Sequence, residues 1–205
     1  YFLPKYKQLD AVAEMHPIKR IRAISEKLET GIYSSSYSPE GRTYIRGTDI
    51  SSGYIDDTGI LRTRALKPTP SSIVREDDIL VTRVGSIGVC GIVEKDFSDS
   101  FFSDNLIRIR LTAEGRAELS PHYLNLLLNT TYGQMQMLRY SRGSVQQRLN
   151  QSQLAQIPVP VIRSECQQKI ESLLIQHRQA KRKSDHLLKQ AKVSVEQLIE
   201  EAVRS

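Results

Sequence analysis

Residues 164–203 read SECQQKIESLLIQHRQAKRKSDHLLKQAKVSVEQLIEEAV, and this stretch decides how the chain is organised. It contains no glycine and no proline, and apolar or small residues recur along it at steps of three and four. The recurring positions are Ile170, Leu173, Leu174, His177, Ala180, Ser184, Leu187, Leu188, Ala191, Val195, Leu198 and Ala202. At a rise of about 1.5 Å per residue, the pattern predicts one continuous helix of about 60 Å.

A helix of this length cannot bury its apolar stripe on the rest of the chain alone. A domain of about 145 residues has an expected radius of gyration of about 15 Å, so a helix of about 60 Å extends beyond it. The stripe therefore predicts pairing with a second helix in a coiled coil, in preference to docking on its own domain. The stripe is thin at His177, Ala180 and Ser184, so the two ends of the helix should contribute most of the pairing energy.

The preceding residues are organised differently, because short strand-like runs dominate them. Such runs occupy 43–50, 78–84, 88–93 and 106–111, separated by turns rich in Gly, Ser and Asp. One helix is expected from Pro121 to about Leu138, with Ser120 as its N-cap. The fold class is therefore α+β, a β-rich globular domain followed by a long C-terminal coiled-coil helix. The expected parts are a lead-in arm or linker at 1–17, the domain at 18–163 and the long helix at 164–205.

The bulk composition describes an ordinary globular protein, with 39% hydrophobic and 25% charged residues. No apolar run approaches the roughly 18 residues that span a bilayer, and no basic-then-apolar leader opens the sequence. Cys90 and Cys166 are separated widely and have no metal-binding or redox spacing. A cytoplasmic protein with no membrane partner and a buried free thiol at Cys90 is the expectation.

A polar segment at 140–161 carries side chains of the kind that recognise nucleic acid. Its loop contains Arg142, Ser144, Gln146, Gln147, Arg148 and Asn150. Arg pairs with guanine and Asn or Gln with adenine in base-edge recognition. The net charge is +6, and residues 111–163 hold five Arg and only two Glu, with no Lys or Asp. This local positive excess favours contact with phosphates over an ordinary solvated loop.

A catalytic centre is not indicated. The four histidines, His16, His122, His177 and His186, are scattered without ligand spacing. The glycine-rich run at 85–91 lacks the ending of a P-loop and is better interpreted as a tight turn between two strands. We therefore expect no metal, no cofactor and no enzymatic activity in this chain.

Several short motifs occur in a fixed order. They are ETGIY at 29–33, YIRGTDI at 44–50, DDILVTRVGSIG at 77–88, PHYL at 121–124, GSVQQRL at 143–149 and IPVP at 157–160. In this order, and followed by a long helix, they resemble one target-recognition domain of the DNA-specificity (S) subunits of type I restriction–modification systems. The segment 161–168 departs from the family pattern, which usually has a second Pro-Leu and a Glu-Gln pair before the helix. Complete S subunits also carry two such domains and two helices, where this chain has one of each.

The resemblance implies a non-catalytic chain that binds a specific double-stranded DNA sequence and sets the target of a methyltransferase/endonuclease complex. The implied partners are double-stranded DNA, an adenine methyltransferase (M) subunit or domain, a restriction (R) subunit, and a second helix from a homodimer partner or another segment. A similar module ends fused N6-adenine DNA methyltransferases. The lead-in YFLPKY at 1–6 resembles their connector, and the absence of an initiator methionine favours this second organisation.

Two classes of DNA contact are expected. Residues expected to hold phosphates are Arg42, Arg46, Arg62, Arg64 and Lys67. Residues expected to read base edges are Arg83, Ser86, Asn105, Arg142, Ser144, Gln146, Gln147 and Arg148. The main alternative is a protein-interaction scaffold, a β-rich domain on a coiled-coil stalk, which should not bind duplex DNA in a salt-sensitive way. A stand-alone nuclease or methyltransferase is disfavoured, because neither metal-binding acids nor an Asn/Asp-Pro-Pro-aromatic motif is present.

Overall fold

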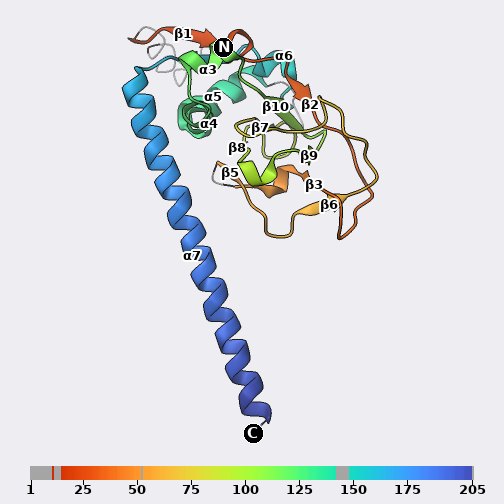
Figure 1. Ribbon diagram of the computed structural model, residues 1–205. Coiled ribbons are helices and arrows are strands. Elements are labelled where there is room, and N and C mark those ends of the chain that lie inside the picture. The colour runs from red at the N-terminus through yellow and green to blue at the C-terminus, as the bar shows by residue number, and fades with distance from the viewer. Residues whose placement is uncertain (1–10, 12–14, 52, 142–147, 205) are drawn as a thin grey trace. The chain divides into compact units, whose positions relative to one another are not determined.

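The computed structural model describes residues 11, 15–51, 53–141 and 148–204 of the chain. The chain divides into two compact units, Tyr1–Gln167 and Gln168–Ser205, and each is described by itself. The first unit holds the strands and the shorter helices, and the second consists of most of helix α7 (Ser164–Arg204), as Figure 1 shows. The α+β class expected from the sequence is confirmed.

Within the described residues, six strands of the first unit form a central sheet in the order β2-β10-β7-β8-β5-β4. Its strands are β2 (Glu29–Thr30), β4 (Ile50–Ser51), β5 (Tyr54–Ile55), β7 (Ile79–Thr82), β8 (Cys90–Ile92) and β10 (Leu106–Ile109). The centre of the sheet is antiparallel, with Leu106 opposite Thr82 and Ile79 opposite Ile92. The runs expected at 78–84, 88–93 and 106–111 thus lie side by side in the middle of the sheet.

Two smaller sheets flank the central one. In the three-stranded sheet, β3 (Arg42–Ile45) lies between β6 (Leu61–Thr63) and β9 (Phe101–Phe102). In the two-stranded sheet, β1 (Ile18–Arg20) pairs antiparallel with β11 (Pro158–Pro160). Proline has no N–H to donate to a neighbouring strand, so within sheets it is restricted mainly to edge strands. Pro158 and Pro160 fit this rule, because β11 has only one neighbouring strand.

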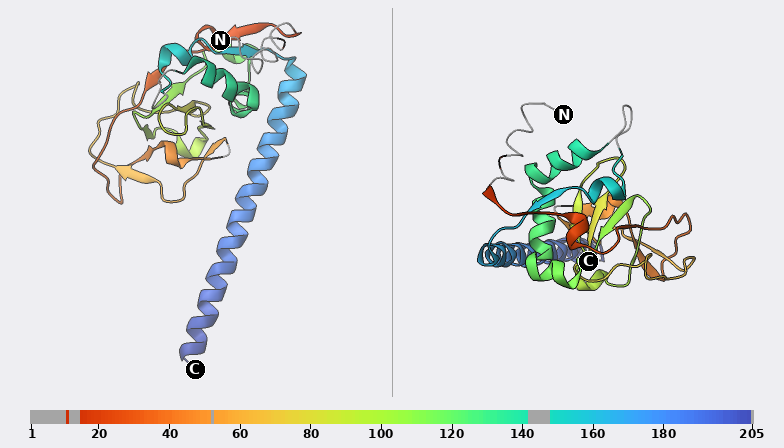
Figure 2. Two further views of the ribbon diagram at one scale, coloured as in Figure 1. Left: turned by 180° about the vertical axis from the view of Figure 1, so that it is seen from behind. Right: turned by 90° about the horizontal axis from the view of Figure 1, so that it is seen from above.

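The helices of the first unit are short. They are α2 (Ile21–Ile24), α3 (Ala113–Glu118), α4 (Pro121–Asn129), α5 (Thr131–Tyr140) and α6 (Gln151–Leu154), with 3₁₀ turns η1 (Gly47–Asp49) and η2 (Lys95–Phe97). The helix α4 packs against β8, and α5 packs against α4 (Figures 1 and 2). The central core is apolar and consists of Ile45, Ile50, Ile55, Val74, Leu80, Val93, Phe97, Phe102 and Leu106.

The single helix expected from Pro121 to Leu138 is wrong in one respect, because two helices occupy this range. Thr130 has an extended backbone (ψ 166°) and serves at once as the C-cap of α4 and the N-cap of α5. Its hydroxyl accepts a hydrogen bond from the Gly133 N–H at 3.4 Å. A Cβ on Gly133 would lie 2.4 Å from the Leu127 carbonyl oxygen, so the tight corner between the helices requires glycine. The apolar periodicity continues across the corner, and for this reason it did not reveal the break.

A side chain of α4 supplements the ladder of β8. The Asn129 amide donates to the Cys90 carbonyl at 3.0 Å and accepts from the Cys90 N–H at 3.2 Å, as a neighbouring strand would. One turn earlier, Asn125 donates to the Gly53 carbonyl at 2.9 Å. Asn129 thus satisfies both backbone groups of Cys90, and Asn125 adds a second donor to a carbonyl that already accepts from the Ile92 N–H. Together the two amides fix α4 against the sheet.

A buried charge cluster lies where β7 begins and β10 ends, at neighbouring positions of the central sheet. Asp78 is fully buried and accepts two hydrogen bonds from Arg110, at 2.8 Å from Nε and 2.6 Å from Nη2. It also accepts from the backbone N–H of Arg75 at 2.7 Å. The neighbouring Arg108 donates to the Ile73 carbonyl at 2.7 Å and lies over the Phe102 ring at 5.7 Å. Burial, together with the nearby Arg110 charge, lowers the pKa of Arg108.

The glycine-rich run between β7 and β8 is a hairpin connection, as expected from the sequence. Gly85 and Gly88 have φ values of 76° and 84°, in the left-handed region that glycine adopts without strain. The Thr82 hydroxyl lies inside the turn, where it donates to the Ser86 carbonyl and accepts from the Val89 N–H. The turn therefore closes on itself through its own polar groups.

The two thiols are expected to differ sharply in reactivity. Cys90 is a buried free cysteine, and burial raises the pKa of its thiol, whereas Cys166 is partly exposed. Because the thiolate is the reactive form, a disulfide-exchange reagent should modify one thiol per folded chain and two in denaturant. Stopped-flow measurement of thiol release, with Cys166→Ser as the control, checks this. Rapid modification of Cys90 in the folded variant would contradict the burial described.

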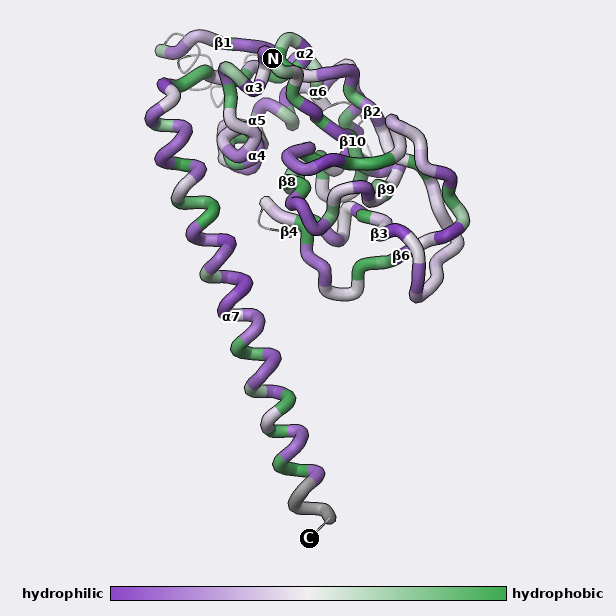
Figure 3. Tube along the Cα trace, viewed as in Figure 1, coloured by the Kyte–Doolittle hydropathy of each residue, from purple (hydrophilic) through white to green (hydrophobic). Residues whose placement is uncertain are grey.

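The long helix is confirmed over the range that the sequence predicts, as α7 runs from Ser164 to Arg204. Apolar positions recur along it between polar ones (Figure 3). Among the side chains of α7 that the structure describes, six large apolar ones are more than half exposed: Leu173, Leu187, Leu188, Val195, Leu198 and Ile199. At its start, Gln167 lies within the first unit, where its amide bonds to the Ser120 N–H and to the Glu118 and Ile162 carbonyls. None of the described helices is long and apolar enough to cross a membrane.

Candidate nucleic-acid interface

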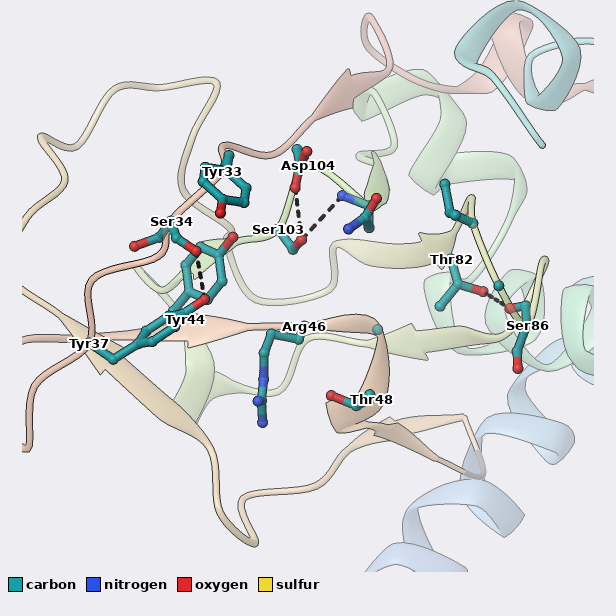
Figure 4. Close-up of a pocket in the computed structure, with 14 residues that line it drawn as sticks. Tyr33, Ser34, Tyr37, Tyr44, Arg46, Thr48, Thr82, Ser86, Ser103 and Asp104 are labelled. Atoms are coloured by element: carbon teal, nitrogen blue, oxygen red, sulfur yellow. Dashed lines mark hydrogen bonds between the residues drawn. The ribbon is translucent and has the colours of Figure 1, made fainter. Parts of the chain in front are cut away.

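Several hydrogen-bonding side chains of the first unit line a pocket of about 530 Å³. Four segments that are distant in sequence line it: Tyr33, Ser34 and Tyr37; Tyr44, Arg46, Gly47 and Thr48; Thr82, Val84, Gly85 and Ser86; Ser103, Asp104 and Asn105. In Figure 4 the tyrosines lie at one side, Thr82 and Ser86 at the other, with Ser103 and Asp104 across from Arg46 and Thr48. The parallel pairing of β3 with β9 brings the second segment close to the fourth.

Three tyrosines form one wall of this pocket. The Tyr37 and Tyr44 rings are 5.7 Å apart at their centroids and tilted by 53°. Their hydroxyls donate to the backbone carbonyls of Ser34 and Ile32, at 2.7 and 2.8 Å. Tyr33 is 71% exposed, and Tyr37 is 42% exposed. With their hydroxyls bonded internally, Tyr37 and Tyr44 are fixed in orientation, and exposed tyrosine rings are surfaces on which a base or sugar can stack.

The segment between β9 and β10 contributes hydrogen-bonding groups to the pocket, and short local contacts hold them in place. Ser103 donates to Asp104 Oδ1 at 3.1 Å and accepts from the Asn105 N–H at 3.2 Å. The Asn105 side-chain amide makes no hydrogen bond to the part of the chain that the structure describes. An amide of this kind can pair bidentately with adenine.

Arg83 lies next to this wall but does not line the pocket. Its backbone N–H donates to the Asn105 carbonyl, and its own carbonyl accepts from the Leu149 N–H. Its Nη1 reaches the Asp104 carbonyl at 3.3 Å, and its buried Nε has no partner among the described residues. Arg83 therefore connects Asn105 of the pocket with Leu149 through its backbone.

Arg46 is the arginine of the pocket, and it is paired. Its guanidinium bonds to both carboxylate oxygens of Asp49, at 3.1 Å from Nε and 2.7 Å from Nη2. This hydrogen-bonded pairing raises the pKa of Arg46. Asp49 is only 4% exposed and also accepts the Arg46 backbone N–H at 2.8 Å. The pair is thus fixed by the turn η1 that follows β3.

The structure brings together only some of the residues predicted from the sequence. Arg46, Ser86 and Asn105 line the pocket, and Arg83 adjoins it. Outside the pocket, Arg42, Arg62, Arg64 and Lys67 are exposed on or beside β3 and β6, and Arg148 is exposed before Leu149. Arg64 is ion-paired with Glu40. The remaining predicted residues, Arg142, Ser144, Gln146 and Gln147, lie outside the described residues.

Sequence reasoning missed the aromatic wall and the acidic corner of the pocket, namely Tyr33, Tyr37, Tyr44, Ser103 and Asp104. A signal was present in the segment Tyr33-Ser34-Ser35-Ser36-Tyr37, where two tyrosines flank serines outside any strand-like run. Aromatic rings in such a segment lack an apolar neighbourhood, which favours an exposed, ligand-facing position.

The fold and the pocket define a class of protein: a β-rich α+β domain whose pocket combines tyrosine rings with hydrogen-bonding side chains, followed by a single long helix. The sequence profile of the type I restriction modification DNA specificity domain matches residues 5–191, and the chain belongs to this family. No curated protein matches the chain in sequence.

Solved structures share this fold at low sequence identity. The S subunit of a type I restriction–modification system from M. genitalium matches at 18% identity with a TM-score of 0.53, covering 77% of this chain and 38% of that one. The HsdS subunit from Thermoanaerobacter tengcongensis matches at 17% with a TM-score of 0.55, covering 86% and 43%. The type IIG restriction endonuclease BpuSI matches at 10% with a TM-score of 0.57, covering 82% and 28%. The chain spans less than half the length of each of these proteins.

Proposed function

We propose that this chain recognises a short sequence in double-stranded DNA and so sets the target of a restriction–modification methyltransferase or endonuclease complex. The observation that carries the proposal is the pocket, in which fixed hydrogen-bonding groups and tyrosine rings converge within a specificity-domain fold. On or after β3 and β6, the exposed Arg42, Arg62 and Lys67 offer positive charge for phosphates. Catalysis is assigned to another domain or subunit.

The helix α7 is proposed to pair with a second helix and to dock an adenine methyltransferase subunit or domain, with a restriction subunit as a further partner. Its more than half-exposed leucines support this role, because a solvated single helix gains nothing from them. The second helix is supplied either by a second copy or by another segment of a longer protein. The domain boundaries proposed are 1–17, 18–163 and 164–205.

Selection from a random duplex library at two salt concentrations tests the proposed function. We expect one short motif to be enriched and to survive the higher salt, because base contacts depend less on counterion release than phosphate contacts do. A folded chain that retains no DNA would favour the alternative, a protein-interaction scaffold. Retention of DNA without any motif would also contradict sequence-specific recognition.

Removal of one exposed lysine tests the phosphate contacts. Lys67→Ala should weaken binding to every sequence alike and reduce the slope of log K against log[salt] by about 0.9. Lys189→Ala on α7 removes the same charge outside the domain and is the control. Fluorescence anisotropy across a salt series measures both slopes. If the two variants lower the slope equally, net charge and not a local contact is responsible.

A further inference from the structure

Arg46, which lines the pocket, is held in a fixed position and still has hydrogen-bond donors without a close partner among the described residues. Asp49 holds Arg46 along one edge of its guanidinium, through Nε and Nη2. The same carboxylate accepts the Arg46 backbone N–H and lies 3.4 Å from the Thr48 hydroxyl. Because Asp49 is almost fully buried while the Arg46 side chain is 34% exposed, the carboxylate supports the arginine from beneath.

This pairing argues against a phosphate-holding role for Arg46. Its positive charge is already balanced by Asp49 at hydrogen-bond distance. A phosphate approaching the same guanidinium would be repelled by that carboxylate. By contrast, among the described residues Arg42 and Arg62 donate only to the backbone carbonyls of Asp99 and Gly41, at 2.8 and 3.3 Å, and no carboxylate there balances their charge. These two remain suited to phosphates, whereas Arg46 is suited to a neutral acceptor.

The donors of Arg46 that Asp49 does not use lie at the tip of the guanidinium, on Nη1 and Nη2. Nη1 has no hydrogen bond to any described residue, and Nη2 has only a long second contact, 3.4 Å to the Gly59 carbonyl. Two parallel N–H groups at the end of a guanidinium match two neighbouring acceptors, which among the bases guanine presents as O6 and N7 in the major groove. A fork held rigid by a carboxylate also loses little rotamer entropy on binding.

We infer that Arg46, positioned by Asp49, is a specificity-determining residue that reads the O6/N7 edge of one guanine. The inference rests on the proposed function and deepens it, because it assigns one base to one side chain. A purely structural role, in which the pair only closes the turn η1, predicts no dependence on any single base pair.

The test uses the full chain, the motif selected by the wild type, and two variants with the same substitution. Arg46→Lys keeps the charge but loses the fork, and Arg116→Lys does the same at an arginine of α3 that is similarly exposed and ion-paired with Asp77. We expect Arg46→Lys to lose preference for guanine at one motif position by roughly 5- to 150-fold, with the other positions and the salt slope unchanged. Arg116→Lys should keep the whole motif.

A change in the DNA provides a second, independent measurement. Replacing that guanine by 7-deazaguanine removes the N7 acceptor but keeps the Watson–Crick pair. It should weaken the wild type more than it weakens Arg46→Lys, so the two changes should not add. This scan decides the question on the wild type even if Arg46→Lys does not fold.

The outcomes separate the two proposals. A wild type that selects a motif, together with an Arg46→Lys variant that selects the same motif with unchanged ratios, overturns the inference while the proposed function stands. A motif in which no guanine is sensitive to loss of N7 also overturns it. If the wild type selects no motif, the proposed function fails and the inference fails with it.

Discussion

Replacement of Asp78 by asparagine is expected to lower the free energy of unfolding by about 3–5 kcal/mol. The side chain keeps its shape, but the charge that balances the buried Arg110, and assists the nearby Arg108, is lost. Both arginines are at most 6% exposed, so water cannot replace the carboxylate. Urea denaturation followed by circular dichroism measures the change as a lower midpoint at unchanged slope.

Asp77 supplies the matched control one residue away. Asp77→Asn removes the same charge, but Asp77 and its partner Arg116 are each about one-third exposed. Such a pair contributes only about 0–1 kcal/mol, and asparagine tolerates the left-handed backbone at this position (φ 68°). If the two variants have the same midpoint, the buried cluster does not stabilise the sheet as described.

The buried arginines Arg108 and Arg110 also show which features of the fold could not be predicted from the sequence. The alternation Leu106-Ile107-Arg108-Ile109-Arg110-Leu111 predicts a strand, and β10 is one. Alternation assigns side chains to two faces of a sheet but does not say what covers each face. Here a segment containing Pro70, Ser71 and Ile73 covers the polar face and accepts the donors of Arg108. The strand was therefore predictable, whereas the burial of its arginines was not.

The pocket illustrates the same limit at the level of function. Arg46, Ser86 and Asn105 were predicted by residue type, because each can bond to a base edge or phosphate. Their meeting depends on β3 lying parallel to β9 and on the hairpin after β7, contacts between segments about twenty to sixty positions apart. The division of arginines into paired and unpaired ones also follows from three-dimensional partners. Asp49 was not singled out from the sequence, although it determines what Arg46 can bind.

The exposed stripe of α7 gives the second large expected effect. Val195→Asp should weaken self-association of the chain at least about 100-fold, because each dimer would lose two buried valines at about 1.5–3 kcal/mol each. Val195 lies on the recurring apolar stripe and is 56% exposed in the single chain. Sedimentation over a concentration series measures the association constant. A monomeric wild type at all concentrations would contradict pairing between copies and leave the second helix to another segment of a longer protein.

Val193 separates the effect of the stripe from every local effect of the substitution. It is also an exposed valine of α7, at 42%, but two residues correspond to about 200° around a helix, so it lies on the opposite face. Val193→Asp changes net charge and helix propensity as Val195→Asp does, at nearly the same distance from the helix end. Those contributions cancel between the two variants, and only burial in a helix pair remains. We therefore expect Val193→Asp to associate like the wild type, and equal weakening by both variants would mean that the apolar stripe is not the pairing surface.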